Sequence, residues 1–321
     1  MKIADLTVME LQERLRNGLV YQIGPFKFQL TVKNCKTLVS QLHWLFAHYP
    51  TFSQPQLIDF AIQVRRPRLW RRWWRPQVEF KADGDPGMAP FPLDHALPML
   101  EWGSNWCIAT HAHRYLMLHA AVVERQGHAI LFPAWPGSGK STLCAALSLS
   151  GWRMLSDEFG LLEPESGLLQ PLPKLTPLKN TSIEVMKRFS PEAVIGPLFE
   201  KTRKGMVAHF RPPAASIEQA QEKAQPRWII FPRYKAGANN VLVPVEKSQA
   251  LLRLANNAFN YKLLATTGFQ AARQLVDQCN CYELNFDSLR AVIPLLLSLY
   301  EQEFVSPPVN NKSRVVNETA D

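Results

Sequence analysis

The fold is decided by the segment AILFPAWPGSGKST, residues 129 to 142. An apolar strand runs into a loop of small residues, and a helix begins at Ser141. The segment matches the phosphate-binding pattern Gly-x-x-x-x-Gly-Lys-Ser/Thr at Gly139, Lys140 and Ser141, with Ala134 in place of the first glycine. Since a positive φ suits only glycine, Ala134 would be strained if the loop required that conformation there.

We expect this segment, called the P-loop below, to bind the phosphates of a nucleotide. Main-chain N–H groups after Pro136 can point toward phosphate oxygens, and the helix N-terminus adds partial positive charge. Lys140 would reach the β- and γ-phosphates, and the Ser141 hydroxyl would coordinate Mg²⁺. The alternative is a turn that only caps an ordinary helix. The predicted nucleotide-binding residues are Pro136, Gly137, Ser138, Gly139, Lys140, Ser141 and Thr142.

Two acids, Asp157 and Glu158, follow the next predicted strand, residues 153 to 155. We expect this strand to lie next to the P-loop strand, because open α/β sheets bind ligands at the carboxyl ends of such strands. An acid there can bind Mg²⁺ or accept a proton from an attacking hydroxyl. The alternatives are a solvated strand end for the acids and a core residue for His119, which lies in the apolar strand predicted at 115 to 123.

The whole pattern predicts an α/β fold with an α+β N-terminal unit. Residues 1–95 form the N-terminal unit, with helices at 6–15 and 37–48, a hairpin around Gly24-Pro25 and a final linker or loop at 83–92. Residues 96–304 form the P-loop domain, and residues 305–321 form a polar, disordered tail. Helices are also expected at 97–110, 141–150, 251–264, 269–279 and 289–303, and strands at 60–64, 128–132, 228–232 and 241–245.

Charge is concentrated in one place. The net charge is +9, and six positive charges lie in RRPRLWRRWWRPQ, residues 65 to 77, without which the net charge is +3. This concentration of charge argues against a protein that coats nucleic acid, and it is compatible with a local anion-binding site. The three tryptophans of the segment could stack on bases or lie at a membrane surface. The alternative is that they pack on the core beneath the arginine stems.

The sequence also favours a cytoplasmic setting. Five scattered cysteines do not form a disulfide framework, and the N-terminal residues do not resemble a signal peptide. No apolar run approaches the ~18 residues of a membrane span. We therefore expect neither a membrane nor a nucleic acid as partner.

Three segments together resemble one family. LHAAVV at 118–123, PAWPGSGKST at 133–142 and GWRMLSDEFG at 151–160 are similar in order and spacing to the HPr kinase/phosphorylase family, especially its HPr kinase-related kinase A branch. That branch also carries a Gly-Pro-Phe motif, an Arg-Arg-Trp/Arg-Pro segment and a Glu-Trp-Gly-x-Asn-Trp box, here Glu101 to Trp106. The resemblance implies a P-loop kinase domain like the C-terminal domain of HPr kinase, related to phosphoenolpyruvate carboxykinase, and a substrate-recognition role for residues 1–95.

The resemblance also implies a chemistry. ATP and Mg²⁺ would phosphorylate a Ser or Thr hydroxyl of a peptide or small protein. Lys140 would hold phosphates, Asp157 would be the general base, and His119 would support it. Ser141, Asp157 and Glu158 would hold the metal. The family's Leu-Glu-[Ile/Val]-Arg-Gly box, whose glutamate helps to hold Mg²⁺, is absent, and Leu178-Lys179-Asn180 supplies a cation in that region.

Partners follow from the same resemblance. Related proteins accompany peptide-modification genes with a PqqD-type peptide chaperone, so a ribosomal precursor peptide is the expected substrate. HPr kinases assemble as hexamers, which suggests a homo-oligomer. Two alternatives stay open: a module that holds ATP to dock a partner without catalysis, and, for the basic segment 201–205, either phosphate binding or a solvated loop.

Overall fold

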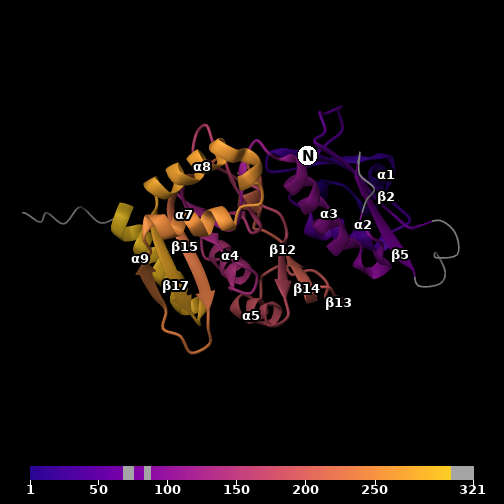
Figure 1. Cartoon of the computed structure of the whole chain (residues 1–321). Helices are drawn as coiled ribbons and strands as arrows, with labels where there is room; N and C mark the ends of the chain where they lie inside the picture. Colours follow the sequence, from indigo (N-terminus) through magenta and orange to yellow (C-terminus); the bar gives the residue numbers. More distant parts are fainter. Residues whose placement is uncertain (68–75, 83–87, 305–321) are drawn as a thin grey trace, which may run out of the picture.

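The computed structural model describes residues 1–67, 76–82 and 88–304, which form a mixed α/β structure of two lobes (Figure 1). The elements from α1 to α3 make up the N-terminal lobe, and those from β7 to α9 make up the P-loop lobe. Most of the Arg/Trp segment, residues 68–75, lies outside the described residues, as does the tail predicted at 305–321.

The N-terminal lobe is built on one sheet. In spatial order its strands are β3 (Thr51–Phe52), β1 (Leu19–Ile23), β2 (Phe26–Lys33), β4 (Phe60–Arg65), β5 (Gln77–Ala82) and β6 (Phe91–Pro92). The predicted hairpin is confirmed, because Ile23 pairs with Phe26 across the turn at Gly24-Pro25. Of the linker predicted at 83–92, residues 83–87 lie outside the described residues, and its end is a strand instead, since β6 pairs with β5 and Phe91 is buried.

Helices α1 (Val8–Asn17), α2 (Lys36–Leu45) and α3 (Ala96–His111) pack into the core of this lobe. α1 begins at a capping box formed by Thr7 and Glu10 and ends at Gly18, whose φ is +102°. These are the three helices that the apolar spacing predicts, with shifted bounds. Short 3₁₀ turns occupy Ile3–Asp5 and Leu93–His95.

A second sheet forms the centre of the P-loop lobe. In spatial order its strands are β11 (Leu169–Gln170), β10 (Phe159–Leu162), β7 (Leu116–Arg125), β8 (His128–Pro133), β15 (Gln225–Tyr234), β17 (Asn280–Phe286) and β16 (Val241–Pro244), with β9 (Arg153–Ser156) paired to β7. Helices α4 (Lys140–Ser148) and α9 (Leu289–Phe304) cover one face, and α7 (Lys247–Asn256) and α8 (Tyr261–Gln278) cover the other. Period-two alternation in β7 and β8 explains the two cores: Ala121 and Ile130 point to α4, whereas Ala120 and Leu131 point to α7 and α8.

The predicted pairing of the strand at 153–155 with the P-loop strand is wrong, because β9 does not pair with β8. Both are antiparallel to β7, which lies between them, so β8, α4 and β9 form a crossover that skips one strand. β9 and β10 share the same edge of β7, with Val122 opposite Ser156 and His119 opposite Phe159. The turn between β9 and β10 therefore places Asp157 and Glu158 close to the middle of β7.

A small third sheet packs beside α4. Its order is β12 (Thr176–Lys179), β14 (Gly205–Phe210) and β13 (Phe199–Thr202), and helix α5 (Thr181–Phe189) follows β12 directly. Ala145 and Ala146 of α4 share a core with Ile183 of α5 and Ala208 of β14. The short helix α6 (Ala214–Glu218) leads from this sheet back to β15.

The single helix predicted at 251–264 is also wrong, because α7 ends at Asn256 and α8 begins at Tyr261. Asn257 and Asn260, which lie between the two helices, hold the chain against β7 through hydrogen bonds. The Asn260 side chain accepts a hydrogen bond from the main-chain N–H of Met117 and donates one to the carbonyl oxygen of Tyr115. A continuous helix would remove these bonds, so the polar contacts override the apolar spacing.

The two lobes meet at α3. The N-terminal core includes Tyr115, Met117 and Leu172 from the P-loop lobe, and the hydroxyl of Tyr49 donates a hydrogen bond to the Pro173 carbonyl oxygen at 2.6 Å. A buried ion pair joins Glu101 of α3 to Lys174 at 3.1 Å. The division at residue 95 stays a prediction, but the helix that follows it packs into the N-terminal core.

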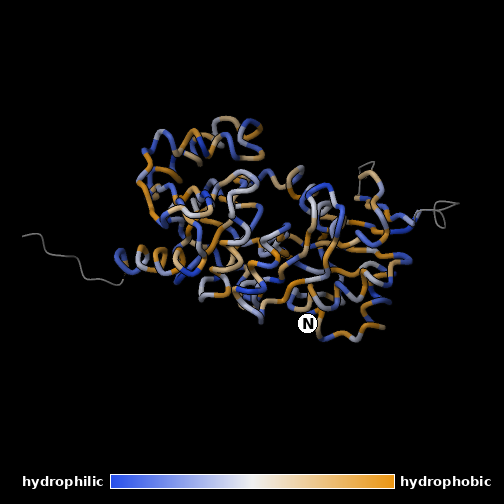
Figure 2. Tube along the Cα trace, turned by 90° about the horizontal axis from the view of Figure 1, so that it is seen from below, coloured by the Kyte–Doolittle hydropathy of each residue, from blue (hydrophilic) through white to orange (hydrophobic). Residues whose placement is uncertain are grey.

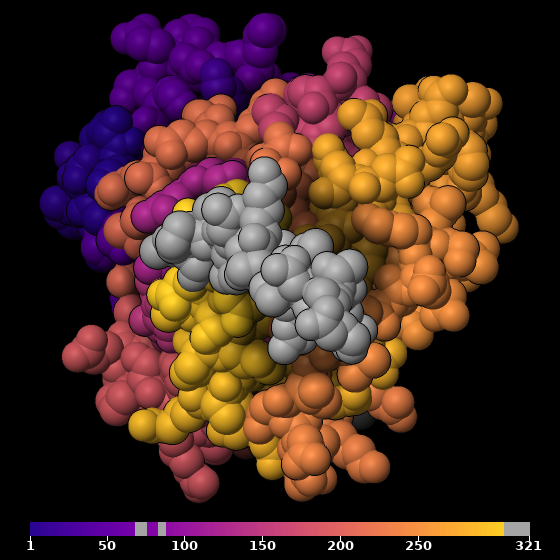
Figure 3. All heavy atoms as spheres, turned by 90° about the vertical axis from the view of Figure 1, so that its left-hand side faces the viewer, coloured from indigo at the N-terminus to yellow at the C-terminus, as the bar shows by residue number. Residues whose placement is uncertain are grey.

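Hydrophobic segments run through both lobes, and hydrophilic residues are common at the outer turns (Figure 2). Viewed from the side of α9, residues late in the chain cover much of the surface, with the N-terminal lobe at its margin (Figure 3). Within residues 1–67, 76–82 and 88–304, no helix is both long and apolar enough to cross a bilayer.

Candidate functional site

The P-loop has a conformation suited to phosphate binding. It joins the end of β8 at Pro133 to the start of α4 at Lys140. Gly137 and Gly139 have φ values of +94° and +85°, in the left-handed region that favours glycine. Ala134 does not adopt a positive φ, so this residue causes no backbone strain where the pattern has its first glycine.

The P-loop borders a cavity of about 750 Å³, called the phosphate cavity below. All seven residues predicted to bind a nucleotide, 136–142, lie on its wall, and so do His119 and Glu158. Asp287 is the other acid on the wall, so cations outnumber acids there, and the charge favours a polyanionic ligand. The cationic side chains on the wall are Lys140, Lys179, Arg188, Lys204 and Arg290.

Three helices begin at this cavity. The first residues of α4, α5 and α9, which are Lys140, Thr181 and Leu289, all line it. The free N–H groups and dipole of a helix N-terminus attract negative charge. Three such ends and five cationic side chains on one wall make a strong site for phosphate groups.

Asp157 lies beneath the wall. Its residue is only 4% exposed, and neither carboxylate oxygen has a partner at hydrogen-bond distance among the described residues, although the neighbouring Ser141 hydroxyl still interacts with the carboxylate and lowers its pKa. Burial raises the pKa of the Asp157 carboxyl, and Lys140 acts in the opposite direction. The Lys140 ammonium donates a hydrogen bond of 2.5 Å to the main-chain carbonyl oxygen of Asp157. Because a buried polar group without a partner is costly, Asp157 is suited to take up a proton or a cation.

His119 lies next to Glu158, and the support of Asp157 by His119 that the family resemblance implies stays a prediction. Its Nε2 atom is 3.6 Å from Oε1 of Glu158. Burial and the neighbouring Lys140 lower the pKa of His119 to about 4, although Glu158 opposes the shift, so the imidazole is neutral near pH 7. Burial alone would raise the pKa of Glu158, but the positive charges of Lys140, Lys204 and Lys179 outweigh it, and the net pKa is lowered. The structure thus places a neutral imidazole beside an ionised carboxylate.

The residues beside the P-loop fit a magnesium ion. Mg²⁺ usually binds one or two carboxylates and completes its shell with waters and substrate phosphates. In the described part of the chain no three His, Cys, Asp or Glu side chains converge as a metal site. The unpartnered Asp157 carboxylate and the Ser141 hydroxyl, which lowers the pKa of Asp157, would hold the ion, with Glu158 on the wall nearby.

Several wall residues were not predicted as site residues. Lys179 stands at the end of β12, in the region where the family box would supply a glutamate, and its cationic character was the available signal. Lys204 comes from the basic segment 201–205, and it lies in the turn between β13 and β14. No feature of the sequence marks Arg188 and Arg290 as site residues, because only the packing of α5 and α9 around α4 brings them to the cavity.

The chain was compared with known proteins. No protein-family model and no curated protein matches it. Among solved structures, it is similar to the HPr(Ser) kinase/phosphatase from Coxiella burnetii, with 12% sequence identity over 58% of this chain and 95% of that one, and a TM-score of 0.28. A likeness of this size establishes neither a family nor an activity, so function is argued from the site.

Proposed function

We propose that the protein is a kinase that transfers the γ-phosphoryl group of ATP to a Ser or Thr hydroxyl of a peptide or small protein. The observation that carries the proposal is the buried, unpartnered Asp157 carboxylate beside Lys140, at the head of a P-loop that lines a cationic cavity. A structural P-loop would need the anion site but would have no use for the costly carboxylate.

The binding energy for a triphosphate would come from fixed positive charge. The P-loop N–H groups, the N-termini of α4, α5 and α9, and the five cationic side chains of the wall surround the same space. Such preorganised charge stabilises phosphoryl transfer, which depends on positioning and charge neutralisation. Mg²⁺, when bound at Ser141 and Asp157, would neutralise phosphate charge.

Asp157 would accept the proton of the attacking hydroxyl. A new bond forms between the hydroxyl oxygen and the γ-phosphorus, the bond from that phosphorus to the bridging oxygen breaks, ADP leaves, and the proton passes to Asp157. While no cation is bound to it, burial raises the pKa of this carboxyl, which favours proton uptake from the hydroxyl. Phosphates would draw the Lys140 ammonium away from the Asp157 carbonyl oxygen and open access to the acid.

Glu158 and His119 would prepare the acceptor side of the cavity. Both main-chain groups of His119 are fixed, since its N–H donates to the Asn257 carbonyl oxygen and its own carbonyl oxygen accepts from the side chain of that residue. This backbone holds the imidazole beside Glu158. We therefore assign His119 a positioning role toward Glu158, and the peptide substrate and its PqqD-type chaperone are part of the same proposal.

A second function has one observation in its favour. Lys179 occupies the wall near the place where the family resemblance expects a metal-binding glutamate. A lysine strengthens phosphate binding but cannot hold Mg²⁺, which suits a module that binds ATP in order to dock a partner. Such a module would keep tight nucleotide binding without chemistry.

Labelled ATP separates the two functions. The protein would be incubated with γ-³²P-ATP, Mg²⁺ and Ser-containing peptides, and nucleotide binding would be followed in parallel with a fluorescent ATP analogue. Label in peptide, lost in Lys140→Ala, supports the kinase. Saturable binding with neither ATP turnover nor label in any peptide supports the docking module.

A further inference from the structure

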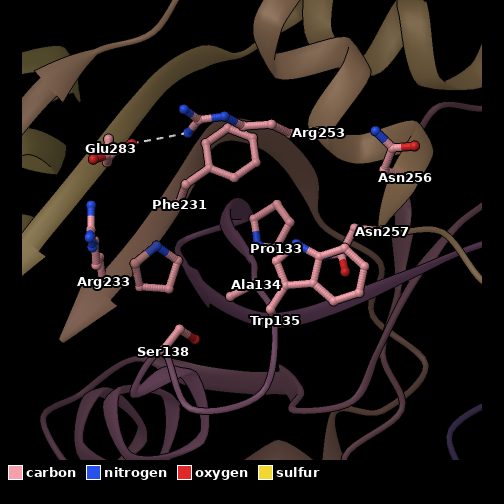
Figure 4. Close-up of a pocket in the computed structure, with 11 residues that line it drawn as sticks. Pro133, Ala134, Trp135, Ser138, Phe231, Arg233, Arg253, Asn256, Asn257 and Glu283 are labelled. Atoms are coloured by element: carbon pink, nitrogen blue, oxygen red, sulfur yellow. Dashed lines mark hydrogen bonds and ion pairs between the residues drawn. The ribbon is translucent and has the colours of Figure 1, made fainter.

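A second cavity, of about 500 Å³, lies on the other side of the P-loop (Figure 4). The ends of β8, β15 and α7 and one residue of β17 form its wall. Trp135 and Ser138 of the P-loop line both cavities, and Trp135 is 67% exposed. A ligand in this cavity would therefore touch the loop that cradles the phosphates.

One wall residue of the second cavity contacts the backbone of His119, which lines the phosphate cavity beside Glu158. This residue, Asn257, exchanges two hydrogen bonds with the backbone of His119, at 2.9 Å and 2.8 Å, and the N–H of Ala134 donates to the same His119 carbonyl oxygen. The imidazole of His119 faces Glu158 in the phosphate cavity. Asn257 of the second cavity therefore contacts His119, and His119 lies beside Glu158 in the phosphate cavity.

The lining of the second cavity suits an extended peptide. The exposed Trp135 ring offers flat apolar surface for side chains, the half-buried Phe231 and two buried prolines line the wall, and the exposed Asn256 amide can bond to peptide groups. Trp135 and Phe231 stand around the space in Figure 4, and Arg253 lies over Phe231 at 5.0 Å from the ring centre. Aromatic rings with adaptable amides are typical of peptide-contacting surfaces.

One charge on this wall is free to recognise a ligand. Arg253 pairs with Glu283 at 3.1 Å, so these two charges offset each other. Arg233 is exposed near the end of β15, and its guanidinium has no ion pair or side-chain hydrogen bond with any residue that the structure describes. The cavity therefore keeps one uncompensated positive charge, which favours an acidic side chain in the occupant.

We propose that this cavity binds the acceptor peptide, with an acidic residue at a fixed distance from the acceptor hydroxyl paired to Arg233. The inference rests on the proposed kinase function. A nucleobase is the less suitable occupant, because the phosphate cavity is the larger of the two and has its own apolar wall at Val185, Phe189 and Leu289.

The test uses Ser-centred peptide libraries in which each flanking position is fixed in turn as Asp, Glu, Lys or Ala. Each library is incubated with the full chain, γ-³²P-ATP and Mg²⁺, and label is measured for the unsubstituted protein, Arg233→Glu and the milder Arg233→Gln. Arg273→Glu, on the exposed face of α8 and outside both cavities, is the matched control. Binding of a fluorescent ATP analogue is measured for every variant.

We expect an acidic preference at one offset from the serine, of about two- to fivefold, which corresponds to one exposed charge pair. Arg233→Gln should abolish the preference, Arg233→Glu should turn it toward Lys, and Arg273→Glu should leave it unchanged. Nucleotide affinity should stay the same in all of them.

Three results would overturn the inference. The first is an acidic preference that survives Arg233→Glu. The second is a change of nucleotide affinity, or of ATP over GTP preference, in the Arg233 variants, which would make the cavity a nucleobase site. The third is a protein that binds and turns over ATP but labels no library. Failure of the proposed function itself looks different, since the unsubstituted protein would then neither turn over ATP nor transfer label.

Discussion

The Nζ atom of Lys140 lies 2.5 Å from the main-chain carbonyl oxygen of Asp157. This bond joins the first residue of α4 to the turn after β9, although β7 separates β9 from the P-loop strand in the sheet. The lysine is itself buried, at 6% exposure. The anion site and the acid are thus held together before any ligand binds.

Lys140→Ala should weaken nucleotide binding strongly. A hydrogen bond to a charged group contributes about 1.5–3 kcal/mol, so the dissociation constant should rise by roughly 10- to 150-fold. Titration with a fluorescent ATP analogue measures this directly. Lys187→Ala, on the solvent side of α5, is the matched control, because its ion pair with Glu184 is exposed and outside the cavity. Equal affinity in Lys140→Ala and the control would remove Lys140 from the phosphate site.

The two P-loop glycines should differ in their tolerance of alanine. Both have a positive φ, but a Cβ at Gly137 would meet open space, whereas a Cβ at Gly139 would lie 2.9 Å from the Phe286 ring and 3.0 Å from Cβ of Tyr234. Gly137→Ala should cost only the left-handed strain of about 1–2 kcal/mol. Gly139→Ala should lose more nucleotide affinity and more thermal stability. The reverse order would show that the loop changes conformation when it binds a ligand.

The buried pair of Glu101 and Lys174 should dominate the stability of the contact between the lobes. The Lys174 ammonium also bonds to the Ser104 hydroxyl at 3.1 Å, and both members of the pair are almost fully buried. Removing one partner leaves an uncompensated buried charge, so Glu101→Ala should lower the unfolding free energy by about 3–5 kcal/mol. Urea unfolding of Glu101→Leu/Lys174→Met tests this explanation. The double variant should lose less than Glu101→Ala, and purely additive losses would disprove the pairing.

His209 should make stability depend on pH. It is fully buried, neither ring nitrogen has a hydrogen-bond partner among the described residues, and burial lowers its pKa to about 3. Between pH 6.5 and about 3 the unfolded chain takes up a proton that the folded chain refuses, so stability falls as the pH falls. The slope from this residue approaches about 1.4 kcal/mol per pH unit well below pH 6.5 and is about half of that at pH 6.5. In His209→Leu, urea unfolding between pH 5 and 6.5 should lose that slope, and an unchanged slope would mean that His209 titrates normally.

Local signals in the sequence were sufficient for much of the fold and for the P-loop. The hairpin at Gly24-Pro25, α4 after the glycine loop and the strands β7, β8 and β15 follow from periodicity and turn residues. All seven predicted P-loop residues line the phosphate cavity because they are contiguous and one loop fixes their geometry.

What the sequence did not reveal depends on contacts between distant segments. The position of β7 between β8 and β9 is a matter of strand order, which periodicity does not encode. The break between α7 and α8 comes from the bonds of Asn260 to β7, made across 143 and 145 residues. The box from Glu101 to Trp106 was noted only through the family resemblance. The structure places this box at the lobe contact through two interactions. Glu101 forms an ion pair with Lys174, and the Lys204 ammonium lies 5.4 Å from the Trp102 ring centre.

The most direct measurement compares Asp157→Asn with Glu158→Gln for two readouts, transfer of γ-³²P label to peptide and binding of a fluorescent ATP analogue. Asp157→Asn keeps the size of the side chain and removes its capacity to accept a proton. We expect it to abolish label transfer and to change the affinity for the ATP analogue, measured without Mg²⁺, by less than about threefold, whereas Glu158→Gln keeps measurable transfer. Label transfer that survives in Asp157→Asn, or is lost only in Glu158→Gln, would contradict the account.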